Sequence, residues 1–235
     1  MGRYLAALLL ILFLPAVGLG GPVATYTSNV PLYNFMPKGT GLSVNREVMA
    51  ITWNSYGSEQ AELSPPRVVM NKTILMSPIP GGFRPAGDMG KIQQGSLYWA
   101  SLEQAYQQAV KYTEDIPKVG IIEINRLVFG MMILNVDDGY PASMAVHLIA
   151  MFRRAIIPDN SILIGTLQPD GRIGTVSALS AKIRLLIPYS QKLFIPSGQL
   201  ATLNPTLTTL LQQHSVTVEE VDTIEQAYQL MVRTR

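Results

Sequence analysis

The most informative stretch of the sequence is ILIGTLQPDGRIGTVSALSAKIRLLI, which occupies residues 162–187. Its first part belongs to an apolar run, SILIGTL at 161–167, that is typical of a buried strand. The sequence PDGR at 169–172 predicts a turn, because proline, aspartate and glycine each favour turn conformations. In SALSAKIRLLI at 177–187 the apolar residues recur at helical spacing. The stretch is therefore expected to fold as a strand, a turn and a helix.

Lys182 lies on the apolar side of this predicted helix. It comes three residues after Leu179 and four before Leu186, so its side chain points along the buried stripe, whereas Arg184 points away. An amine that loses its water becomes neutral more readily, and a neutral amine can take the proton of a serine hydroxyl. Alternatively, the stem of the lysine lies along the core and its charged end reaches solvent. Lys182 is thus a candidate catalytic base, with a structural role as the alternative.

Strands and helices are interspersed along the rest of the chain, which indicates the α/β or α+β class. The predicted strands are 46–53, 119–129, 130–136, 192–197 and 216–221, and the predicted helices lie within 95–116, at 141–154 and at 223–233. A loop rich in proline and glycine is expected at 77–87.

The N-terminus has the layout of a secretory signal peptide. A basic residue, Arg3, precedes an apolar core from Leu5 to Leu14, and small residues follow it. This core is shorter than the ~20 residues that a membrane-spanning helix needs. We predict a signal peptide at 1–24, a linker or extended arm at 25–44 and one domain at 45–235. An uncleaved N-terminal anchor is the alternative, and only then is a membrane expected as a partner. In both cases the protein is expected to be exported, to the periplasm or the exterior.

The composition fits one well-packed domain and disfavours several kinds of partner and site. Of the 235 residues 48% are hydrophobic and 14% are charged, so the chain can bury a sizeable core. The formal net charge of +2 is too small to indicate a nucleic-acid partner. The chain has no cysteine, and His147 and His214 are its only histidines, so we expect neither disulfides nor a metal centre. Phosphate-binding and dinucleotide-binding glycine motifs are absent from the sequence, so we expect no cofactor and no ATPase module in this chain.

Residues 162–187 resemble the proteolytic domain of Lon proteases. That family has a glycine-punctuated strand–turn–strand, G-x-x-x-x-x-G-x-[VI], followed by a helix that carries L-x-x-K. The matching residues, in order and without a gap, are Gly165, Gly171, Ile173, Leu179 and Lys182. Weaker similarity extends over about residues 45–233. The resemblance implies an α+β fold of mixed β-sheets with packed helices, Lys182 as the base of a Ser/Lys dyad, and self-association, because Lon relatives form rings.

The position that the resemblance assigns to the nucleophile holds a proline. Family members carry G-P-S-A-G or G-D-S-A-S at the head of the second helix, with the first serine as nucleophile, whereas this chain has GYPAS at 139–143. In a direct alignment Pro141 falls on the nucleophile, and the Ile157–Pro158 pair keeps the family's distance from it. Ser143 is the candidate nucleophile if the helix starts two residues later, because two residues turn a side chain by about 200° around a helix.

Neighbouring polar residues have two interpretations each. His147 lies four residues after Ser143 on the same helix face. It is either a base for the serine or a histidine packed at the edge of the core. Asp137 and Asp138 either orient a base or favour the helix dipole. Thr166 is a second-choice partner for Lys182.

Two functions follow from these residues. In the first, an exported peptidase, Ser143 attacks the peptide carbonyl, Lys182 takes its proton, and backbone N–H groups at the helix start hold the oxyanion. In the second, a pseudo-peptidase keeps the fold and binds peptides or assembles into oligomers, which Pro141 favours. The expected partners are peptides or unfolded polypeptides and further copies of the chain.

Overall fold

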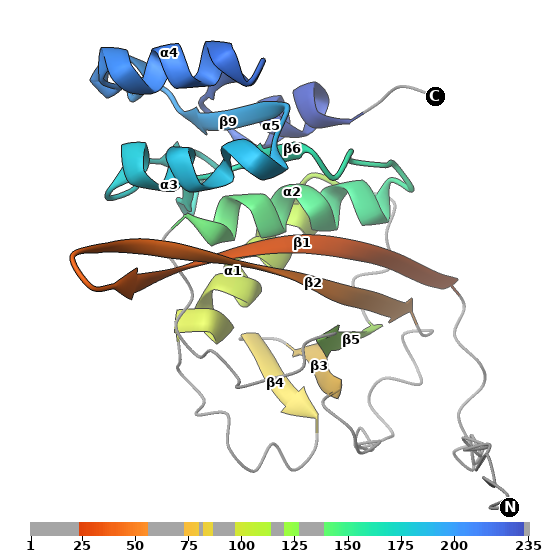
Figure 1. Ribbon diagram of the computed structural model, residues 1–235. Helices are drawn as coiled ribbons and strands as arrows, with labels where there is room; N and C mark the ends of the chain where they lie inside the picture. Colours follow the sequence, from red (N-terminus) through yellow and green to blue (C-terminus); the bar gives the residue numbers. More distant parts are fainter. Residues whose placement is uncertain are drawn as a thin grey trace, which may run out of the picture.

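The computed structural model describes residues 24–55, 73–79, 82–86, 97–113, 120–126 and 139–232. Within them the chain has a mixed α+β architecture with two larger sheets and a small hairpin (Figure 1). The helices are α1 (Leu97–Lys111), α2 (Tyr140–Phe152), α3 (Leu179–Leu186), α4 (Pro205–Gln213) and α5 (Ile224–Met231). The predicted signal peptide up to residue 23, the predicted strand at 130–136, and Asp137 and Asp138 lie outside the described residues.

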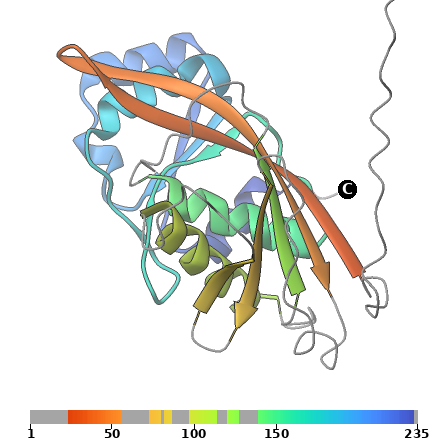
Figure 2. The same cartoon turned by 90° about the horizontal axis from the view of Figure 1, so that it is seen from below.

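The largest sheet is antiparallel and is built on a long hairpin. Its strands are β1 (Ala24–Lys38), β2 (Gly41–Ser55), β3 (Thr73–Ile79), β4 (Gly82–Ala86) and β5 (Gly120–Arg126), in the order β1-β2-β5-β3-β4. β1 and β2 pair from Ala24↔Ser55 to Lys38↔Gly41, so the two-residue turn Gly39–Thr40 fixes their register. Figure 2 shows this hairpin extending well beyond the other strands of the sheet.

Two segments differ from their predicted form. Residues 25–44, predicted as a linker or extended arm, are extended, but they are paired with β2 from Ala24 to Lys38. The loop predicted at 77–87 is wrong, because β3 and β4 pair across it. Both predictions rested on prolines, which are frequent in loops but are also found in edge strands. Pro31 and Pro37 lie in β1 and Pro85 in β4, and these are the edge strands of the sheet, where a missing N–H removes no ladder bond on the outer side.

The second sheet is parallel, with the order β10-β9-β6, and separates two hydrophobic clusters. Its strands are β6 (Ser161–Leu163), β9 (Lys192–Pro196) and β10 (Thr217–Val221). Side chains alternate between the two faces of a strand. Phe194 therefore packs in the cluster that contains α2 and α5, whereas Leu193 and Ile195 pack in the cluster that contains α3 and α4. The hairpin joins both clusters, with Val30 in the first and Tyr33 in the second.

The remaining predictions along the C-terminal half have mixed outcomes. Helices are confirmed at α2, α3 and α5, and the Thr223 hydroxyl caps α5 by accepting a hydrogen bond from the N–H of Gln226 at 3.2 Å. The strand predicted at 161–167 is split, because β6 ends at Leu163 and β7 (Thr166–Leu167) pairs instead with β8 (Ile173–Gly174). Helix α4 was not predicted, although Asn204 and Pro205 are typical of a helix start and Asn204 Oδ1 accepts from the N–H of Leu207 at 2.7 Å.

Candidate functional site

The start of α2 is held against the break between β6 and β7. The N–H of Gly165 donates to the carbonyl oxygen of Gly139 at 3.0 Å, and the N–H of Ala142 donates to the carbonyl oxygen of Gly165 at 3.4 Å. Gly139 is the N-cap of the helix, and Pro141 lies in its first turn, where a missing N–H costs little. The helix begins at Tyr140, so Ser143 lies in its first turn and the helix does not start two residues later.

Gly165 and Gly171 are glycines for two different steric reasons. A Cβ on Gly165 would overlap Cγ2 of Ile173 and lie 3.6 Å from the Cβ of Ala142, so only glycine lets the strand approach this closely. Gly171 has φ +86°, a conformation that side-chain-bearing residues rarely adopt. The geometry thus supplies a reason for a glycine at each position.

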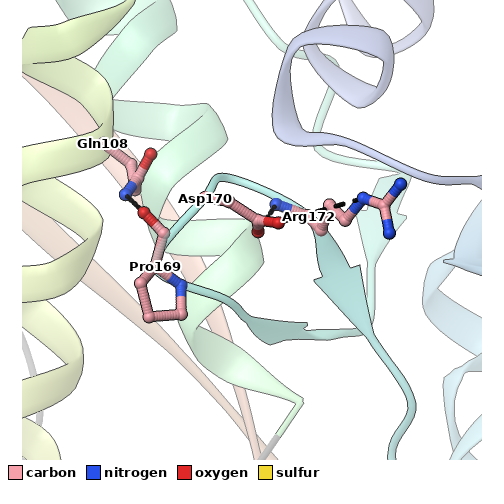
Figure 3. A network of polar contacts seen from close by, with 4 residues as sticks. All are labelled: Gln108, Pro169, Asp170 and Arg172. Atoms are coloured by element: carbon pink, nitrogen blue, oxygen red, sulfur yellow. Dashed lines mark hydrogen bonds and ion pairs between the residues drawn. The ribbon is translucent and has the colours of Figure 1, made fainter.

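Two glutamines of α1 hold the β7–β8 turn from the other side. Gln104 Nε2 donates to the carbonyl oxygen of Leu167 at 2.6 Å, and Gln108 Nε2 donates to that of Pro169 at 2.6 Å (Figure 3). Within the turn, Asp170 Oδ1 accepts from the N–H of Arg172 at 3.0 Å. Sequence reasoning did not find these glutamines. Their spacing of four residues on one helix face was the available signal.

Lys182 is buried, as its place on the helical stripe predicted. Its exposed fraction is 2%, and Leu179, Ile183 and Leu186 are buried beside it while Arg184 is exposed. The Nζ atom lies 5.6 Å from the centroid of the Phe35 ring, which comes from β1. A contact of this kind between a cation and an aromatic face contributes about 0.5–2 kcal/mol in general.

Ser143 and His147 form a contact, but through the backbone of the serine. Nδ1 of His147 lies 2.8 Å from the carbonyl oxygen of Ser143, and a carbonyl can only accept, so Nδ1 carries the proton. Both residues are buried, with exposed fractions of 8% and 4%. Burial lowers the pKa of His147, and the hydrogen bond to Ser143 and the charge of Asp159 oppose this less strongly. The pair is therefore a side-chain-to-backbone bond within a helix, and this nitrogen is not placed as a base for the hydroxyl.

The candidate nucleophile and the candidate base lie on different helices that pack into different clusters. α2 shares its cluster with Leu163 and Phe194, whereas α3 shares its cluster with Ile162 and Leu193. Thr166, the second-choice partner of Lys182, pairs with Gly174 in the β7–β8 hairpin. The structure thus connects the start of α2 to Gly165, and connects Lys182 to the β1–β2 hairpin.

The comparisons with known proteins do not assign the chain to a family. No protein-family model matches the chain, and no curated protein matches it. Within the described residues, no three His, Asp or Glu side chains gather in a way that could hold a metal ion. In the same part of the chain, no helix combines the length and the apolar character that crossing a membrane requires.

The buried histidine predicts a loss of stability at acid pH. Because the pKa of His147 in the folded protein lies below 6.5, the unfolded chain binds a proton first as pH falls through 6.5, and the free energy of unfolding decreases there. His147→Gln should reduce this decrease, measured by urea unfolding at pH 7.5 and 5.5. His214→Gln is the matched control, because it removes the other histidine at an exposed position at the end of α4. An equal pH dependence for His147→Gln and the parent would contradict this assignment.

Gly165→Ala should destabilise the protein by about 1–3 kcal/mol, because the added methyl overlaps Ile173 and moves the start of α2. Urea unfolding measures the loss. Gly41→Ala is the control, since the nearest atom to its added Cβ is 3.9 Å away, and it should change the free energy of unfolding by no more than about 0.5 kcal/mol. If both variants unfold at the urea midpoint of the parent, the close approach at Gly165 does not matter for stability.

Proposed function

We propose that the chain is an exported domain with a Lon-type proteolytic fold whose nucleophile position has been lost, and that it binds peptides without cleaving them. The observation that carries the proposal is the first turn of α2, where Pro141 stands in the direct register and the helix begins at Tyr140. The order of glycines, Leu179 and Lys182 along residues 162–187 supports the kinship. Export rests on the signal-peptide pattern of residues 1–24.

Acyl transfer at the start of this helix would need a nucleophilic hydroxyl and free backbone N–H groups. The first turn of α2 lacks the hydroxyl at position 141 and has few free N–H groups. A nucleophile at position 141 would require a hydroxyl, which proline lacks. An oxyanion hole would require backbone N–H groups that point at the substrate. Pro141 has no N–H, and the N–H of Ala142 already donates to Gly165. The first turn therefore offers fewer donors than a working peptidase of this kind would use.

An active Ser143/Lys182 peptidase is the second candidate function, and one observation favours it. Lys182 is 2% exposed, and lysine is among the residue types least often buried so fully, which makes its position a candidate for a function. In that case Lys182 would take the proton of the Ser143 hydroxyl as it attacks the peptide carbonyl. Without an ATPase module in this chain, the substrates would be short or unfolded polypeptides.

Loss of the nucleophile leaves peptide binding by strand addition intact. An extended peptide adds to the edge of a sheet through its backbone, and the described sheets present edges at β1, β4, β6 and β10. The same edges serve homo-oligomer assembly, in which a second copy of the chain takes the place of the peptide.

The test offers a fluorescein-labelled unstructured peptide to the purified protein and follows anisotropy and chromatographic cleavage together. We expect saturable binding, no cleavage, and the same affinity for Ser143→Ala. Lys182→Met, which keeps the stem of the side chain, serves as the second variant. Cleavage by the parent that both substitutions abolish would establish the active peptidase instead. Absence of both binding and cleavage would contradict the peptide-binding role and leave assembly, which light scattering measures.

A further inference from the structure

The β1–β2 hairpin has two halves, and among the described residues only one of them pairs with a third strand. From Met49 to Ser55, β2 pairs with β5 as well as with β1, so this proximal half belongs to the five-stranded sheet. Residues 32–38 and 41–47 pair only with each other within the described residues. We call residues 32–47 the distal hairpin. Pro31, which has no N–H to donate, lies opposite Val48 at the boundary between the halves.

The distal hairpin lies over Lys182. Tyr33, Phe35 and Val44 pack in the cluster that contains Leu179, Ile183 and Leu186 of α3, and Phe35 places its ring over the amine at 5.6 Å. The Tyr33 ring also meets that of Tyr189, with centroids 5.9 Å apart. These contacts, together with the packing of α3 itself, leave the lysine 2% exposed.

The described attachment of the distal hairpin combines one buried ring, that of Tyr33, with two partly buried side chains. A two-stranded hairpin is at best marginally stable without packing. Phe35 and Val44 are only partly buried, and the ion pair between Arg46 and Asp159, 3.7 Å long, has side chains 38% and 83% exposed, so it contributes little. Near the tip, Leu42 stands across a surface hollow from Ser180, Ala181, Arg184 and Leu185 of α3.

We propose that the distal hairpin is a flap that controls access to Lys182 and opens without unfolding the rest of the protein. Opening separates Phe35 and Tyr33 from α3 and exposes the amine, while the proximal half stays in the sheet. Any contact of the exposed amine with a bound peptide rests on the proposed function, whereas the opening of the hairpin does not. Regions that open locally are those held by few contacts, and the distal hairpin, unlike the proximal half, has no pairing with β5 in the described part of the chain.

The test measures the acylation rate of Lys182 by a small N-hydroxysuccinimide ester, using peptide mass spectrometry, at a series of urea concentrations below the unfolding transition. A local opening exposes little surface, so the rate should be nearly independent of urea. A rate that rises with urea as steeply as global unfolding would overturn the proposal. Lys192, whose side chain is 50% exposed, is the internal standard for reagent activity.

Phe35→Ala should raise the acylation rate of Lys182 about tenfold, because it removes the ring over the amine and weakens the closed flap. Tyr26→Ala is the matched control. Tyr26 is an aromatic residue of the same strand in the proximal half, where its ring meets Phe152 at 6.0 Å, and its loss should leave the rate unchanged. Equal rates for Phe35→Ala, Tyr26→Ala and the parent would overturn the flap. No peptide is used, so failure of peptide binding and failure of the flap are separate results.

Discussion

The arrangement of the candidate site depends on the contact between Gly165 and the first turn of α2. One hydrogen bond runs from Gly165 to Gly139 and another from Ala142 back to Gly165, so the helix start and the strand end are fixed to each other in both directions. α2 is buried along its whole length from Tyr140 to Phe152, which leaves it little freedom to shift along its axis. That contact therefore fixes which residues lie in the first turn of α2, and Pro141 is one of them.

The same contact fixes the direction in which the Ser143 side chain leaves the helix. Ser143 is two residues further along a helix whose start is fixed, so its side chain points about 200° away from the direction of position 141. Its carbonyl accepts the hydrogen bond of His147, a neighbour one turn later. Lys182 reaches its buried position from another helix and meets Phe35 of the hairpin. The burial of Lys182 and the start of α2 at Tyr140 thus have different structural causes.

Local periodicity predicted the C-terminal part of the fold well. The apolar spacing around Lys182 predicted both α3 and the burial of the amine, because four residues of a helical stripe are enough to define a face. The capping residue Thr223 predicted the start of α5. The split of residues 161–167 could not be predicted, since the run is continuously apolar and the break depends on the contact that Gly165 makes with a helix distant in sequence. The hairpin was missed because prolines at an edge strand look like prolines in a loop, although the two-residue Gly39–Thr40 turn was a visible signal.

For the candidate site, sequence reasoning identified the residues but not their partners. The spacing of Ser143 and His147 predicted a shared face, yet only coordinates distinguish a bond to the hydroxyl from a bond to the carbonyl. The contact of Lys182 with Phe35 joins residues far apart in the chain, and it depends on how the hairpin crosses α3.

The most direct measurement of the central claim is mass spectrometry of the protein after reaction with a serine-directed fluorophosphonate, beside the variant Pro141→Ser. The variant restores a hydroxyl and an N–H to the first turn of α2. The account predicts no adduct on the unsubstituted protein and an adduct at position 141 of the variant that Lys182→Met abolishes. An adduct on Ser143 of the unsubstituted protein that depends on Lys182 would contradict it.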